Sequence, residues 1–270
     1  MSIFSELFEY SFMTRAVIAG ILVSLCSSLL GVSLVLKRYS MIGDGLSHVS
    51  FGALAIAAAL NTAPLAVSIP LVIIAAFFLL RITESGSMRG DAAIAVFSSS
   101  SLAIGIIVTG LTTGITTDVC NYMFGSVLAM SRTDVYISVI LSFAVLALFI
   151  VFYNRIFAVT FDEPFSRATG VRVDLYNSAL AVLTAVTIVL GMRIMGALLI
   201  SSLIIFPALS AMRVCRYFKG VIICAAVIST VCFFIGICAS FYLEIAVGAS
   251  VVIANLIVFI TFSLAARLRR

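Results

Sequence analysis

About nine apolar stretches, each near the ~20 residues that a helix needs to cross a bilayer, follow one another along the chain. We therefore expect an all-α polytopic membrane protein with about nine (eight to nine) transmembrane helices, forming a single transmembrane domain over residues 1–270. Several of the connections are very short. The expected spans are residues 14–36, 39–60, 63–82, 91–112, 133–153, 176–192, 194–212, 220–241 and 245–266.

The composition leaves little room for another class of protein. Of the 270 residues, 63% are hydrophobic and 10% are charged, and the mean hydropathy is +1.30. A soluble domain is about 25% charged, so the bilayer is an obligatory partner and no additional soluble domain is expected. The six cysteines show no CxxC or other metal-ligand spacing, and we interpret them as small hydrophobic residues.

The basic residues indicate how the chain is oriented. The net charge of +5 lies in short loops, so it is interpreted as a topology signal and no nucleic-acid partner is expected. With the N-terminus outside, every one of the 16 Lys and Arg residues except Arg15, Arg132 and Arg193 falls on the inner side. The positive-inside rule therefore predicts an outside N-terminus and a cytoplasmic C-terminus.

Two loops are longer than a connection requires. The outer one, residues 113–132, contains the apolar stretch 120–130, which is too short to span and is predicted to form an interfacial or re-entrant helix. Its side chains Tyr122, Met123 and Phe124 form a candidate apolar plug, or outer gate. The alternative is a helix that merely rests in the membrane interface.

The inner loop, residues 154–177, mixes acidic and basic residues. Within it, Asp162 is a candidate N-cap, Pro164 lies in the first turn and Gly170 is a stop, so a short helix is predicted. A short helix on the cytoplasmic side suits docking of another protein. An ordinary solvated loop is the alternative.

The only histidine, His48, follows Asp44 by four residues inside an apolar segment, so both side chains lie on one helical face. Measured from Tyr39, Asp44 lies about 7 Å and His48 about 13 Å into the segment. Ionisable groups at such depth generally face a bundle interior or a hydrated path. Imidazole with carboxylate suits zinc, manganese or ferrous iron at a transient site, since two ligands cannot close a tetrahedral shell.

Two alternatives remain for this pair. Asp44 caps the helix while His48 hydrogen-bonds a neighbouring helix, or the pair relays protons. Covalent chemistry has no support, because the sequence contains no Walker A, GxSxG or HExxH motif. The chain is therefore not expected to be an enzyme, and uphill transport would need an ion gradient or a separate subunit.

Four stretches resemble the permease subunits of ATP-binding-cassette importers for zinc, manganese and iron. Together they cover nearly the whole chain in the family's order. One departure is Ser166, where alanine is commoner in the family. The stretches are "GVSLVLKRYSMIGDGLSHVSFGALAIA" (31–57), "YMFGSVLAMSRTDV" (122–135), "FDEPFSRATGV" (161–171) and "MGALLISSLIIFPALSAMR" (195–213).

The resemblance implies a permease similar in fold to the vitamin B12 and iron-chelate importers, in the cell membrane of a prokaryote. It implies a homodimer with two cytoplasmic ATPase subunits, which alone bind ATP, and an extracytoplasmic metal-binding protein. No permanently bound cofactor is implied; the metal ion is cargo. The ATPase-coupling residues that it implies are Asp162, Glu163, Pro164, Phe165, Ala168 and Gly170.

The competing hypothesis is a self-sufficient secondary carrier or channel in which Asp44 and His48 relay protons or cations. A membrane scaffold without transport is a third hypothesis, but it does not explain an ionisable pair at depth.

Overall fold

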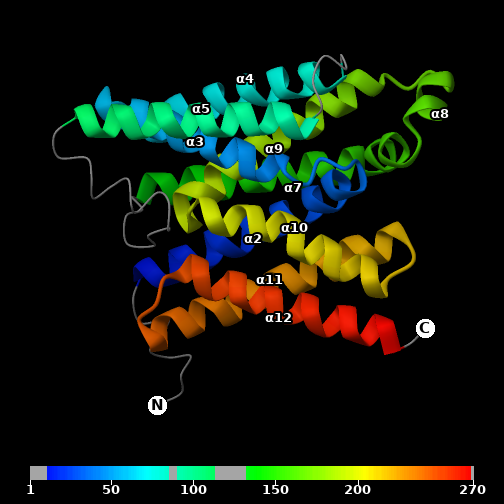
Figure 1. Cartoon of the computed structure of the whole chain (residues 1–270). Helices are drawn as coiled ribbons and strands as arrows, with labels where there is room; N and C mark the ends of the chain where they lie inside the picture. Colours follow the sequence, from blue (N-terminus) through cyan, green and yellow to red (C-terminus); the bar gives the residue numbers. More distant parts are fainter. Residues whose placement is uncertain (1–10, 85–89, 113–131, 269–270) are drawn as a thin grey trace.

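The computed structural model describes residues 11–84, 90–112 and 132–268, and within these ranges every regular element is a helix (Figure 1). The helices are α2 (Ser11–Leu36), α3 (Ile42–Ala59), α4 (Pro64–Glu84), α5 (Gly90–Leu111), α7 (Arg132–Phe161), α8 (Glu163–Ala168), α9 (Val173–Met195), α10 (Ala197–Val214), α11 (Phe218–Leu243) and α12 (Val247–Leu268).

In the described part of the chain, eight helices are long and apolar enough to cross a bilayer. Helix α10 is not among these eight, because its apolar part, Leu199–Val214, is shorter. Figure 1 shows α2 starting at one end of the bundle and α12 finishing at the other, which requires an odd number of passes. The predicted all-α fold with eight to nine transmembrane helices is therefore confirmed.

The bundle has a buried centre and an exposed periphery. Most residues of α2, α3 and α9 are buried among other helices, whereas only 22–28% of α5, α7 and α12 is buried. Helix α2 contacts α7, α9, α10 and α11 and so occupies the middle of the bundle. The exposed side chains of the outer helices are largely Ile, Leu, Val and Phe, which suits contact with lipid.

Small residues bring the central helices close together. A Cβ at Gly31 of α2 would lie 2.1 Å from the Ile204 carbonyl oxygen of α10, so only glycine permits this approach. The Ser229 hydroxyl of α11 donates to the Ser24 carbonyl of α2 at 3.0 Å. Close backbone contact and interhelical hydroxyl bonds are typical of packing in lipid, where apolar burial alone does not favour helix association.

Helices α9 and α10 form a hairpin joined by Gly196. This residue has φ 85° and ψ 163°, a conformation that is essentially restricted to glycine. Nearby, Arg193 of α9 pairs with Asp134 of α7 at 2.8 Å, and both side chains are nearly buried, at 11% and 12% exposure. The C-terminal end of α9 is therefore held both by the hairpin and by α7.

Helix α7 continues past Tyr153 to Phe161, so the first part of the predicted 154–177 loop is helical. The Phe218 ring of α11 packs on this extension, with ring centroids 4.9 Å from Phe157 and 5.6 Å from Phe161. Aromatic contacts between α7 and α11 thus stabilise the C-terminal extension of α7, although the sequence there is already more polar.

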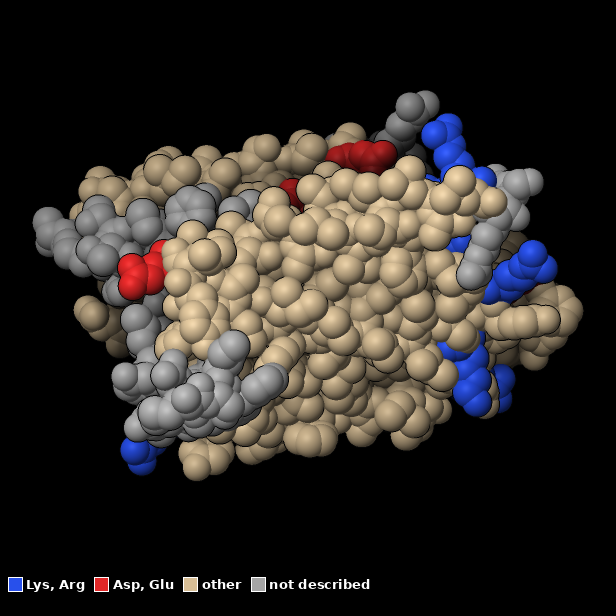
Figure 2. Space-filling view, turned by 90° about the horizontal axis from the view of Figure 1, so that it is seen from below, with Lys and Arg blue, Asp and Glu red and all other residues tan. Residues whose placement is uncertain are grey.

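Lys and Arg side chains gather at one end of the bundle (Figure 2). Helices alternate in direction, so this end carries every described basic residue that the sequence placed inside. Only Arg15, Arg132 and Arg193 belong to the opposite end. The residues at the basic end are Lys37, Arg38, Arg81, Arg155, Arg167, Arg172, Arg213, Arg216, Lys219 and Arg267.

The predicted outer gate cannot be placed in this arrangement. Tyr122, Met123 and Phe124, with the short helix predicted for 120–130, lie outside the described residues.

Replacing Gly196 by alanine should destabilise the α9–α10 hairpin. A side chain in this backbone conformation costs about 1–3 kcal/mol, and the thermal midpoint of the purified protein should fall accordingly. Gly110→Ala is the matched control, because a Cβ there meets nothing within 4 Å. Equal thermal midpoints for the two variants would contradict the assigned role of Gly196.

Candidate functional site

Asp44 and His48 lie together near the start of α3, as predicted. The helix begins at Ile42 and not at Tyr39, so measured from its first residue the pair lies about 3 and 9 Å along the axis. The Oδ2 atom of Asp44 is 3.8 Å from Nε2 of His48. The two side chains therefore present an oxygen and a nitrogen to the same small volume.

Asp44 and His48 are the accessible residues in the first part of α3, which other helices otherwise bury. From Ile42 to Ala55, every residue of α3 is buried except Asp44 and His48, whose side chains are 45% and 23% exposed. Polar groups at a helix surface in a membrane need a polar or hydrated neighbour. The single chain thus leaves accessible the one part of α3 that can bind a cation.

Glycines let the neighbouring helices close around this segment. A Cβ at Gly45 would lie 2.6 Å from Ile94 of α5, and one at Gly43 would lie 3.0 Å from Ile204 of α10. Further along, a Cβ at Gly52 would lie 2.8 Å from the Ser101 carbonyl oxygen. These glycines therefore allow α3 to pack closely on α5 and α10, which fixes the face of α3 that carries Asp44 and His48.

The described residues do not supply the structural roles considered for the pair. Helix α3 has Met41 at its N-cap without a side-chain capping bond, and Asp44 lies within the first turn. His48 has no hydrogen bond to a neighbouring helix in the part of the chain that the structure describes. Across that same part, no third His, Cys, Asp or Glu joins the pair to form a metal site.

The second candidate site is the short helix α8. Asp162 accepts a hydrogen bond from the Phe165 amide at 2.9 Å, and Pro164 lies in the first turn. At the other end, Gly170 has φ 82° and the Val171 amide donates to the Ser166 carbonyl at 3.0 Å. The predicted start and stop of this helix are confirmed.

Most of the predicted coupling residues of helix α8 are exposed at the protein surface. Asp162, Pro164, Ala168 and Gly170 are exposed, Glu163 is half-buried, and the Phe165 ring is 64% exposed. A single exposed apolar side chain is common at protein surfaces, so the exposure of Phe165 is compatible both with a docking helix and with a solvated segment.

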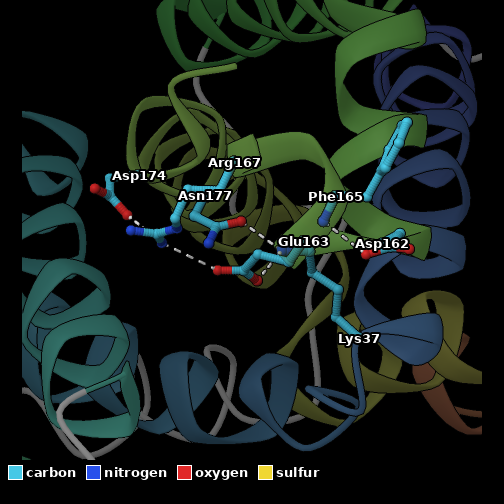
Figure 3. A network of polar contacts seen from close by, with 7 residues as sticks. All are labelled: Lys37, Asp162, Glu163, Phe165, Arg167, Asp174 and Asn177. Atoms are coloured by element: carbon cyan, nitrogen blue, oxygen red, sulfur yellow. Dashed lines mark hydrogen bonds and ion pairs between the residues drawn. The ribbon is translucent and has the colours of Figure 1, made fainter. Parts of the chain in front are cut away.

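Polar contacts join α8 to two long helices (Figure 3). Lys37, at the end of α2, lies 3.6 Å from Glu163 and donates a hydrogen bond to Asn177 of α9. Arg167 of α8 contacts Asp174 of α9 at 3.0 Å. The sequence used Lys37 only as a topology signal and did not predict its contact with Asn177, because a pairing across 140 positions leaves no local pattern.

Comparison with known proteins now decides the family. The model of the ABC 3 transport family matches residues 9–266, which is almost the whole chain. The chain belongs to this family. It is therefore a membrane component of a transport system and not in itself a catalytic enzyme.

Individual relatives agree with this assignment. The chain is 30% identical to the high-affinity zinc uptake system membrane protein ZnuB of Haemophilus influenzae, over 91% of this chain and 94% of that protein. It is 27% identical to the manganese transport system membrane protein MntC of Halalkalibacterium halodurans, over 93% of this chain and 86% of that protein.

Solved structures share the fold. PsaBC from Streptococcus pneumoniae, determined in complex with Fab, matches with a TM-score of 0.88 and 26% identity, covering 99% of each chain. An inward-facing putative metal-chelate type ABC transporter matches with a TM-score of 0.77 at 13% identity, over 94% of this chain and 86% of that one. The likeness in fold to metal-chelate importers, implied by the sequence resemblance, is confirmed.

The capping bond of α8 can be tested by itself. Asp162→Ala removes the acceptor for the Phe165 amide and should cost about 1 kcal/mol of local stability, which corresponds to roughly fivefold faster amide exchange. Hydrogen exchange over 163–168 in the purified protein measures this change. Asp162→Asn keeps an oxygen acceptor and should exchange like the natural protein; equal acceleration in both variants would contradict the capping role.

Proposed function

We propose that the chain is the permease of an ATP-driven importer of divalent transition-metal ions, in which Asp44 and His48 contact the ion in transit. The supporting observation is the accessible carboxylate–imidazole pair in an otherwise buried membrane helix. This donor set suits zinc, manganese and ferrous iron. The zinc and manganese systems named for its relatives agree with that chemistry.

Family membership favours this function over a self-sufficient carrier. An ABC transport family couples its permeases to ATPase subunits, and the permease itself then needs no nucleotide motif. The same membership supports a prokaryotic cell-membrane location with an extracytoplasmic metal-binding protein as donor. The collected basic residues support a cytoplasmic position for α8 and the C-terminus, and an outside N-terminus.

A homodimer would complete the ion site. The described part of one chain brings two donors together here, whereas a closed tetrahedral shell needs four. Two copies of the pair would supply two carboxylates and two imidazoles. Neighbouring α5 exposes Ser99 and Ser100 within its apolar length. Hydroxyls in that position suit an interface between two chains or a hydrated path better than lipid.

Helix α8 is the proposed contact with the ATPase. Its exposed Phe165 and capped ends form a rigid projection on the basic side of the bundle. The coupling residues Asp162, Glu163, Pro164, Ala168 and Gly170 surround this ring in the sequence. Each subunit of a homodimer would bind one ATPase, giving two per importer.

The metal pair should be essential for uptake. Asp44→Ala and His48→Ala should each lower ATP-dependent metal uptake by more than about a hundredfold, since losing even an outer partner of a metal ligand costs 10–100-fold. Uptake is measured in proteoliposomes with the ATPase and the metal-binding protein. Ser47→Ala is the control, because the Ser47 hydroxyl only bonds the Asp44 carbonyl. Normal uptake by both alanine variants in assembled complexes would contradict the proposal.

The ATPase contact is testable by cross-linking in a variant whose native cysteines are replaced. A cysteine at Phe165 should cross-link to a cysteine introduced on the ATPase surface, because the ring is exposed on the proposed docking helix. A cysteine at Leu60, exposed at the opposite end of the bundle, should never do so. Absence of any Phe165→Cys product in complexes that hydrolyse ATP would show that α8 is not the contact.

A further inference from the structure

Lys37 is a nearly buried cation at the junction of three elements. Its side chain is 7% exposed, and its ammonium lies 3.6 Å from the Glu163 carboxylate of α8. It also donates a hydrogen bond to the Asn177 amide oxygen of α9, as Figure 3 shows. A buried charge is tolerated only when oxygen partners replace its water, so these contacts fix where the end of α2 can lie.

The Glu163 carboxylate serves two cations at once. One oxygen faces Lys37, and the other lies 3.5 Å from Arg167, which in turn contacts Asp174 at 3.0 Å. The Arg167 contacts are exposed to water, which weakens them. The contact of Lys37 is the sheltered one, so it forms the stronger tie between α8 and the long helices.

The Phe165 ring points away from this network in Figure 3. Helix α8 therefore has two different faces. One carries the exposed Phe165 ring, and the other carries Glu163, which is directed toward Lys37. A displacement of the ring by a partner protein must move Glu163 too, because both residues belong to the same six-residue helix.

A short, hydrogen-bonded turn connects Lys37 to helix α3. The Tyr39 amide donates to the Leu34 carbonyl at 2.8 Å and the Arg38 amide to the Val35 carbonyl at 3.1 Å, a tight helix-ending turn with Arg38 at φ 62°. The Ile42 amide then donates to the Tyr39 carbonyl at 3.0 Å, and α3 begins. Asp44 follows within the first turn of that helix.

We propose that Lys37 is the positioning residue through which movement of α8 reaches the Asp44–His48 pair. The inference rests on the proposed function, since it assumes that α8 meets the ATPase and that the pair meets the ion. Lys37 lies outside the coupling loop, and its ammonium ties Glu163 on α8 to the turn that opens α3. Removing it should separate ATP hydrolysis from transport while leaving both ends of the pathway intact.

The test compares metal uptake and ATP hydrolysis in the same proteoliposomes. Lys37→Met should hydrolyse ATP but carry about tenfold fewer ions per ATP, within the 5–150-fold range of coupling between sites. Lys219→Met is the matched control, an exposed lysine at the same end of the bundle. Lys37→Arg, which keeps a donor cation, should recover part of the lost number of ions carried per ATP hydrolysed.

A second arm keeps the inference testable if Lys37→Met fails to assemble. Glu163→Gln removes the carboxylate charge and should lower the same ratio, and combining it with Lys37→Met should add little, because both variants break one contact. An unchanged ratio in assembled Lys37→Met or Glu163→Gln, or an equal loss in Lys219→Met, would overturn the role of Lys37. Absence of ATP-dependent uptake with the natural chain would instead overturn the proposed function.

Discussion

Lipid cannot hydrogen-bond the polar groups of the chain, and this constraint governs the rest of the structure. Many hydroxyls inside the spans donate to carbonyls of their own helix, as Thr184 does to Leu180 at 2.7 Å and Thr187 to Leu183 at 2.8 Å. Glycines such as Gly31 then let backbones meet closely. Against this background, the accessible Asp44–His48 pair departs from the pattern that the other α3 residues follow.

The two nearly buried cations hold α9 in different ways. At its C-terminal end, Arg193 contacts Asp134 directly at 2.8 Å and both side chains are sheltered, so separating them leaves two poorly solvated charges without a partner. At its N-terminal end, the Lys37 ammonium donates to Asn177 and lies 3.6 Å from the Glu163 carboxylate, whose side chain is 40% exposed. Water reaches the carboxylate of this longer contact, so the junction at Lys37 can rearrange at lower cost than the one at Arg193.

Patterns local in the sequence were sufficient for much of this fold. Apolar length located the membrane helices, and Asp162, Pro164 and Gly170 located α8, because capping acts within a few residues. The α7 extension to Phe161 depends on packing against Phe218, distant in sequence, and the Lys37 contacts depend on where α8 and α9 meet α2. Spacing identified Asp44 and His48 but not their accessibility, which only the arrangement of α5 and α10 decides.

A pair of ligands on one helix suits an ion that must leave again. A metal held by four donors of one rigid chain would dissociate slowly, whereas donors divided between two chains separate when those chains move apart. One turn of α3 keeps Asp44 and His48 on the same face of the helix, with their side chains 3.8 Å apart. In the proposed homodimer, the affinity for the ion would then depend on the distance between the two α3 helices that carry the pairs. The closely packed start of α3, tied through its turn to Lys37, makes that helix able to move as one piece.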